Sequence, residues 1–194
     1  MKWANYYLLI LENDKQCFEN AIYLIERYNI PVENINTTQP INGFPHLNYD
    51  FLKGIGLSDK LMIIGHGRQS PPAIGGVKMQ YSPSQLALFL KDQYKVNEVG
   101  LISFKACDLG NGSFLYDFFE AFTSGGGKIG GCIGYKGEVM NTTRGEAVGL
   151  WDYVKRELFL GKNPDQQRVT IVQGNAEVPS EYGNKRRFKR TQTV

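Results

Sequence analysis

The chain has 194 residues, of which 42% are apolar and 21% are charged, a composition typical of a globular domain with a full hydrophobic core. Its formal net charge of +3 is too small to indicate nucleic-acid binding by itself. The three cysteines, Cys17, Cys107 and Cys132, match neither a disulfide framework nor zinc-ligand spacing. They favour a reducing compartment, and we expect no structural metal site.

The first half of the chain reads as a strand, a helix, a loop, a second strand and a second loop. The apolar run Tyr6–Leu11 has the length of a strand. It is too short for a signal peptide or a membrane span, and Glu12 and Asp14 follow it where a cleavage site would need small residues. The next segments are a helix at 18–28, a loop at 37–50, a strand at 60–64 and a long irregular connection at 71–76.

The second half continues this alternation. Ser82, Pro83 and Gln85 combine a capping residue, a proline at the first helical position and a capping-box partner, so they predict the start of a helix that runs to Tyr94. The segments that follow are a strand at 99–104, a helix at 114–122, a strand at 129–133, a helix at 145–159 and a strand at 169–172.

Alternating strands and helices predict an α/β fold with a mostly parallel central sheet flanked by helices on both faces. No internal repeat or long linker divides the chain, so we expect one domain over 1–184 and a basic C-terminal tail over 185–194. The tail is either a solvated terminus or a site for a polyanion. Its cations are Lys185, Arg186, Arg187, Lys189 and Arg190.

Two successive strands lead into reactive side chains. The strand at 60–64 leads to His66, and the strand at 99–104 leads to Cys107. Ligands of open α/β sheets bind beyond the carboxyl ends of the strands, so we expect these side chains to meet there. A thiolate nucleophile beside an imidazole is the dyad of a cysteine peptidase. The amides of Gly67 and Cys107 are candidate donors to the oxyanion, although a lone Cys or His is more often structural.

These segments resemble the clan of caspases, legumains, gingipains and clostripain. The resemblance rests on two strings, Leu61-Met62-Ile63-Ile64-Gly65-His66-Gly67-Arg68 and Leu101-Ile102-Ser103-Phe104-Lys105-Ala106-Cys107-Asp108-Leu109. The Gly-His-Gly-Arg and Cys-Asp-Leu parts are most similar to the autoprocessing cysteine protease domains of large bacterial toxins. The similarity covers less than half of the chain. It implies a caspase-haemoglobinase-like three-layer sandwich, with His66 as general acid or base, Cys107 as nucleophile and Gly67 in the oxyanion hole.

The chain departs from these families around the nucleophile. Toxin domains usually have Gly before the Cys and Ser after it, where this chain has Ala106 and Asp108. Caspases have Gln-Ala-Cys, and Lys105 replaces that Gln. We expect the Asp108 carboxylate to raise the pKa of the Cys107 thiol. The departures leave room for a pseudoenzyme or an unusual specificity.

The expected function is that of a cysteine endopeptidase, as a bacterial effector or toxin-processing protease that acts on a peptide or protein. The alternatives are an inactive caspase-like scaffold that binds a partner, and a thiol acyltransferase or hydrolase with the same dyad. We expect no required cofactor, no nucleic acid and a location in the cytoplasm or a host cytosol.

The resemblance also raises two questions about ligands. Toxin domains of this kind are activated by inositol hexakisphosphate, so the basic tail is a candidate pocket together with Lys128, Lys136, Arg144, Lys155 and Arg156. A basic P1 residue would need an acid in the pocket, for which Glu138, Glu146 and Asp152 are candidates. An apolar P1 residue is equally open.

Overall fold

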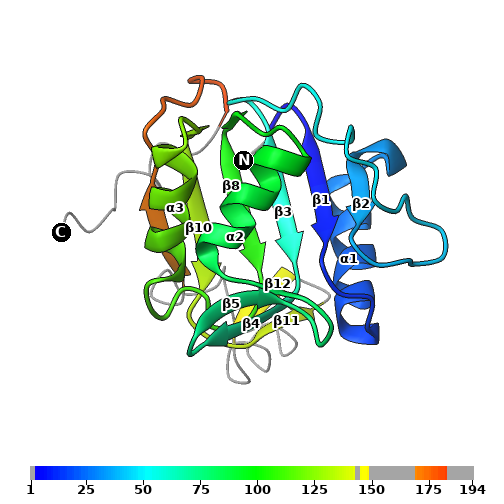
Figure 1. Ribbon diagram of the computed structural model, residues 1–194. Coiled ribbons are helices and arrows are strands. Elements are labelled where there is room, and N and C mark those ends of the chain that lie inside the picture. The colour runs from blue at the N-terminus through cyan, green and yellow to red at the C-terminus, as the bar shows by residue number, and fades with distance from the viewer. Residues whose placement is uncertain (1–2, 143–144, 149–168, 183–194) are drawn as a thin grey trace.

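A six-stranded sheet forms the centre of the molecule. The computed structural model describes residues 3–142, 145–148 and 169–182, and within them the strand order is β13-β10-β8-β3-β1-β2 (Figure 1). The strands are β1 (Tyr6–Ile10), β2 (Ile35–Thr37), β3 (Lys60–Ile64), β8 (Leu101–Lys105), β10 (Gly131–Tyr135) and β13 (Val169–Gln173). All neighbours are parallel except β10 and β13, which are antiparallel. The predicted α/β fold with a mostly parallel sheet is confirmed.

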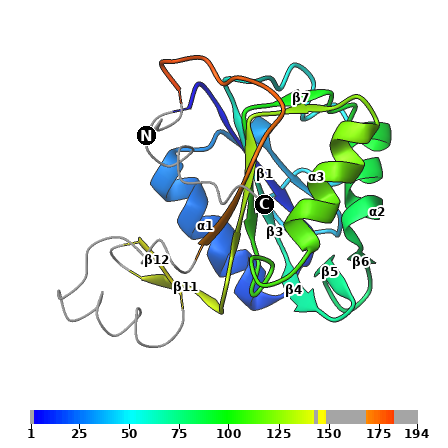
Figure 2. The ribbon, with the colours of Figure 1, turned by 90° about the vertical axis from the view of Figure 1, so that its left-hand side faces the viewer.

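Helices cover both faces of this sheet, which gives three layers (Figure 2). The helix α1 (Lys15–Tyr28) lies on one face, and α2 (Pro83–Leu88) and α3 (Phe114–Ser124) lie on the other. A π-helical turn, Phe89–Gln93, extends α2. The predicted capping box is present, because Ser82 accepts a hydrogen bond from the Gln85 amide and the Gln85 side chain accepts one from the Ser82 amide.

The apolar core is divided by the sheet. Alternate residues of β1 point to opposite faces, so Leu8 packs with Cys17 of α1 while Leu9 belongs to the larger cluster under α2 and α3. That larger cluster includes the buried aromatic side chains of α3, and one of them, Phe118, meets Phe104 of β8 edge to face. Burial on both faces explains why β1 and β3 are almost continuous apolar runs.

Three small sheets extend the central one. The strands β4 (His66–Gln69), β5 (Pro72–Gly75) and β6 (Gln80–Tyr81) form an antiparallel sheet just beyond β3. The hairpin of β11 (Val139–Thr142) and β12 (Gly145–Val148) follows β10, and Figure 1 shows both small sheets at the end of the molecule toward which β3 and β8 run. At the other end β7 (Glu98–Val99) pairs with β9 (Lys128–Ile129). A short 3₁₀ turn, Val32–Asn34, precedes β2.

The structure corrects several sequence-based boundaries. The connection at 71–76 is not irregular, because β5 occupies most of it through antiparallel pairing with β4. The strand at 99–104 is divided by Gly100 into β7 and β8. The helix at 145–159 is wrong at its start, since 145–148 pair with β11 as β12, and the rest of it lies outside the described residues. The basic tail, Lys185 to Arg190, also lies outside them.

Within the part of the chain that the structure describes, no helix combines the length and the apolar character needed to cross a bilayer.

Candidate active site

His66 and Cys107 follow two neighbouring strands at the same distance. β3 and β8 are parallel, and their register pairs Ile64 with Lys105. His66 and Cys107 each lie two residues beyond that pair, at the carboxyl edge of the sheet. The structure therefore places both predicted residues where open α/β sheets bind their ligands.

The chain turns sharply at Cys107, whose side chain is half-buried. Asp108 follows with a left-handed backbone (φ 59°), and its amide donates to the carbonyl of Gly137 at 3.3 Å. A residue other than glycine rarely adopts this conformation, and it is tolerated best by Asp and Asn. This turn leads the chain away from the sheet directly after Cys107, two residues beyond the end of β8.

The surroundings of Cys107 disfavour its thiolate. Burial raises the pKa of the Cys107 thiol, and the carboxylates of Glu138 and Asp108 raise it further. A hydrogen bond from the Val139 amide opposes this only in part. The expected effect of Asp108 on the thiol pKa is confirmed.

Gly67 packs directly on the backbone of the candidate nucleophile. A Cβ atom at position 67 would fall on the carbonyl oxygen of Cys107, so no other residue fits without displacing the main chain. β4, to which Gly67 belongs, is held against β5 by pairing with Ile74. This packing brings the backbone of Gly67 next to Cys107, as a shared oxyanion hole requires, and the role of their amides stays a prediction.

His66 has a partner that the sequence analysis did not anticipate. The Nε2 atom of His66 contacts the Oδ2 atom of Asp14, which is the N-cap residue of α1. The other carboxylate oxygen of Asp14 accepts a hydrogen bond from the Cys17 amide at 2.8 Å. Burial alone would raise the pKa of Asp14, but the Cys17 amide and His66 together hold it below its ordinary value. With Nε2 in contact with Asp14, proton transfer between His66 and Cys107 would have to use Nδ1, and that role stays a prediction.

Glu12 attaches the small sheet of β4, β5 and β6 to the end of β1. Its carboxylate is buried and accepts hydrogen bonds from the amides of Asn13 (2.9 Å) and Val77 (2.8 Å). A Cβ atom at Gly76 would overlap this carboxylate, so the loop passes directly over it. Glu12 thus helps to hold the sheet that carries His66 and Gly67.

Lys105 is buried at the end of β8. Its Nζ atom donates to the hydroxyl of Tyr135 at 2.7 Å and lies 5.1 Å from the centroid of that ring. The pair joins the carboxyl ends of β8 and β10 below the site. Lys105 therefore contributes to the support of the Cys107 turn.

The other two cysteines are buried. Cys132 lies inside β10, and burial raises the pKa of its thiol to about 12. Cys17 lies in the first turn of α1, and burial and then Asp14 raise the pKa of its thiol well above its ordinary value. All three cysteines are free, and Cys107 alone among them is partly accessible.

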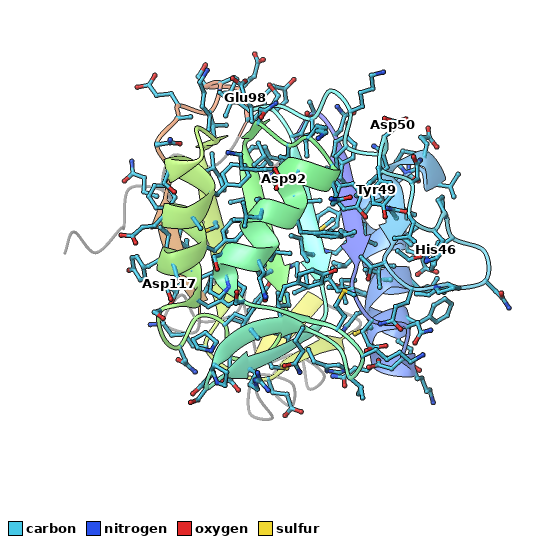
Figure 3. The ribbon with its side chains drawn as sticks, in the orientation of Figure 1. His46, Tyr49, Asp50, Asp92, Glu98 and Asp117 are labelled. Carbon is cyan, nitrogen blue, oxygen red and sulfur yellow. The ribbon has the colours of Figure 1, made fainter. Side chains whose placement is uncertain are left out.

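The remaining sequence candidates lie away from the dyad or outside the described residues. His46 is exposed in its loop at the outer edge of the molecule, and Glu98, which pairs with Lys128 at 2.8 Å, lies at the opposite end of the sheet (Figure 3). Lys136 is exposed near the site. Glu146 lies in β12, where its backbone pairs with Asn141. Outside the described residues are the basic tail, Arg144, Asp152, Lys155 and Arg156.

No protein-family model matches the chain, and a search of the curated proteins finds no match. The function therefore has to be inferred from the residues of the site itself.

Proposed function

We propose that the protein is a cysteine endopeptidase in which Cys107 is the nucleophile and His66 the general acid and base. The observation that carries the proposal is the pairing of β3 and β8 in a register that puts both residues two positions beyond Ile64 and Lys105. The close packing of Gly67 on Cys107 supports it further. Asp14 is proposed as a positioning residue, because it contacts the ring of His66.

The reaction follows from these roles. The thiol of Cys107 gives its proton to Nδ1 of His66 as the sulfur attacks the peptide carbonyl, and the amides of Gly67 and Cys107 receive the oxyanion. His66 then donates that proton to the amine, the C–N bond breaks and an acyl-enzyme remains. A water molecule loses a proton to His66 and attacks the acyl carbon, which releases the acid and restores the thiol.

The charges around Cys107 favour a cationic substrate. Glu138 and Asp108 both raise the pKa of the thiol, so both carboxylates act on the position where the substrate binds. A Lys or Arg side chain bound near Glu138 would offset this negative charge and favour the thiolate. Of the two specificities left open by the sequence, the structure supports a basic P1 residue.

The raised pKa of Cys107 also supports a second candidate function. An inactive scaffold needs no thiolate, and the two carboxylates make the free thiolate less stable. Such a protein would bind a peptide or protein partner at the same edge of the sheet. The acyltransferase alternative uses the same dyad with an acyl acceptor other than water, and the hydrolase alternative uses it on an acyl donor other than a peptide.

The cysteines bear on the compartment in which the protein acts. Three free cysteines support a reducing compartment, either the cytoplasm or a host cytosol.

Activation by inositol hexakisphosphate would need several converging cations. Lys128 is engaged by Glu98 at the far end of the sheet, so such a pocket would depend on the other candidate cations, which are Lys136, Arg144, Lys155, Arg156 and the basic tail. Calorimetry at low ionic strength tests this, and an absence of binding would exclude the activator.

Peptidyl acyloxymethyl ketones with Arg, Lys or Leu at P1 test the peptidase directly. We expect an Arg or Lys probe to label Cys107 of the folded protein, and labelling to be lost in His66→Ala. Cys132→Ala should be labelled like the wild type. Labelling of Cys107 only after denaturation would favour the scaffold, and labelling of Cys17 in its place would overturn the assignment of the nucleophile.

A further inference from the structure

A cluster of reactive side chains shares His66 with the dyad. Its members are Asp14, Cys17 and His66, and their ligand atoms all lie within 4.8 Å of one another. We propose that these three side chains form a binding site for Zn²⁺, and that the bound cation blocks His66 as a base. The binding of Zn²⁺ is independent of the proposed function, whereas its effect on catalysis rests on that function.

The three ligand atoms are near enough to be joined by one cation, because all of them lie within 4.8 Å of one another. Zinc bonds of about 2.0 Å to nitrogen and oxygen and about 2.3 Å to sulfur place one nitrogen, one oxygen and one sulfur of a tetrahedron roughly 3.3–3.5 Å apart. Side-chain rotation would reach that spacing by moving Oδ2 of Asp14 and Nε2 of His66, now in contact, apart around the ion. Three protein ligands leave the fourth position for water.

The kinds of ligand select the cation. An imidazole nitrogen, a thiolate and a carboxylate oxygen together suit a borderline-soft ion such as Zn²⁺. Ca²⁺ and Mg²⁺ prefer oxygen ligands throughout, so this set discriminates against them. The cation would replace the thiol proton of Cys17, which leaves with the solvent. Two anionic ligands then balance the charge of the ion.

The fold holds two of the ligands in place before the cation arrives. Asp14 and Cys17 are three residues apart at the start of α1, and the Cys17 amide binds Oδ1 of Asp14, which leaves Oδ2 directed at His66. Cys17 is only 2% exposed, so its sulfur approaches the cluster from the protein interior. A buried thiol beside a fixed carboxylate and a half-exposed imidazole gives the site one closed side and one open side.

Zinc binding would change the chemistry of the imidazole. When Nε2 of His66 coordinates the ion, the proton of the neutral ring remains on Nδ1. Nδ1 is the nitrogen that is proposed to accept the proton of Cys107. It cannot accept that proton while it already carries one. Zn²⁺ would therefore inhibit the peptidase reversibly without touching Cys107.

Metal titration of the chelator-treated full chain tests the site. Zn²⁺ is measured by competition with a chromophoric chelator, and Co²⁺ by the charge-transfer absorption of a cobalt–thiolate bond. We expect one equivalent to bind, and the thiolate band to vanish in Cys17→Ser. Asp14→Asn, which can still cap α1, should lose at least tenfold in affinity. Cys132→Ser, buried in β10 outside the cluster, is the matched control and should bind as the wild type does.

Cys107→Ala tests whether the second half-buried thiol takes part in metal binding. We expect its Zn²⁺ affinity and its cobalt–thiolate band to be unchanged, and a loss of either would show that Cys107 is a metal ligand and overturn the proposal. Absence of a thiolate band in the wild type would overturn it as well. Circular dichroism checks the fold of each variant, and Asp14→Asn remains decisive if Cys17→Ser unfolds. If no peptidase activity is found, the metal titrations still decide whether the site binds Zn²⁺. If activity is found, half inhibition of Asp14→Asn should need at least tenfold more Zn²⁺ than half inhibition of the wild type.

Discussion

The Oδ2 atom of Asp14 contacts Nε2 of His66, although 52 residues separate them in the chain. Asp14 can reach the ring because β1 and β3 are parallel neighbours, and α1 begins immediately beyond the end of β1. The same carboxylate caps α1 through the Cys17 amide. Asp14 therefore serves the stability of a helix and the orientation of the candidate base at once.

Two substitutions of Asp14 separate these roles. Asp14→Ala removes the cap and should lower the free energy of unfolding by about 0.5–2 kcal/mol. Asp14→Asn retains an oxygen that can accept from the Cys17 amide, so it should cost much less. Both variants lose the carboxylate beside His66, and both should lower kcat more than they raise KM. Chemical denaturation and steady-state kinetics check this. An Asn variant with full kcat would show that Asp14 only caps the helix.

Gly67→Ala tests the packing against the candidate nucleophile. The added Cβ would meet the Cys107 carbonyl oxygen, so the backbone of β4 or of the Cys107 turn must move. We expect a loss of about 1–3 kcal/mol in unfolding free energy, as for other overpacked sites, and a loss of Cys107 labelling by the peptide probe.

Gly56→Ala is the matched control for Gly67. A Cβ at Gly56 would meet nothing within 4 Å, and its backbone needs no positive φ. That variant should keep both its stability and its labelling. If both variants keep the stability and the Cys107 labelling of the wild type, the close packing of Gly67 on Cys107 is not needed for the reactivity of the site.

The two histidines should differ sharply in their importance. His66→Ala removes the proposed acid and base and should lower the peptidase rate by roughly two to four orders of magnitude. His46 is exposed in a loop at the edge of the molecule, so His46→Ala should leave the rate unchanged. Kinetics on a single peptide substrate measure both. Equal losses would contradict the pairing of His66 with Cys107.

The sequence could predict the juxtaposition of His66 and Cys107 because it follows from two short-range signals. Each residue comes just after an apolar run of strand length, and helical spacing between the runs predicts a parallel crossover. The register of Ile64 with Lys105 then brings the two ends together. No long-range information beyond the handedness of the crossover is needed.

The partners of the dyad could not be predicted in the same way. In the sequence Glu12 and Asp14 only mark the end of the first apolar run, because no local pattern indicates that this strand lies next to β3. The helix expected at 18–28 begins at Lys15 in the structure and so includes Cys17, whose nearness to His66 depends on the same strand order. A spacing rule for metal ligands finds residues that are close along the chain, and the third ligand here comes from another strand.

The helix expected at 145–159 shows a different limit. The segment 145–148 contains one strongly apolar position at its end, which fits a short strand as well as the start of a helix. Pairing of Val139 with Val148 and of Thr142 with Gly145 decides for the hairpin. Such pairing is a tertiary influence that overrides a weak local pattern.

The last prediction concerns the titration of Cys107. Because burial, Glu138 and Asp108 raise its pKa, alkylation of the folded protein should increase with pH through a midpoint above the value of about 8.5 for an unfolded cysteine. Because the pKa of Cys107 is higher in the folded than in the unfolded chain, its thiol form stabilises the folded state. This contribution to the free energy of unfolding is fully present below the unfolded pKa and is lost as the pH rises through the folded pKa. Iodoacetamide labelling followed by peptide mapping measures Cys107 separately from the two buried cysteines.

Charge-removing variants make this prediction specific. Glu138→Gln and Asp108→Asn each take away a carboxylate that acts on the thiol, so each should lower the midpoint and speed labelling at pH 7.5. Asn tolerates the left-handed backbone at position 108, so the turn should survive. Glu98→Gln, at the opposite end of the sheet, should leave the rate as it is. If Glu138→Gln and Asp108→Asn slow the labelling, these carboxylates do not oppose the thiolate, and the electrostatic argument for a basic P1 residue fails with them.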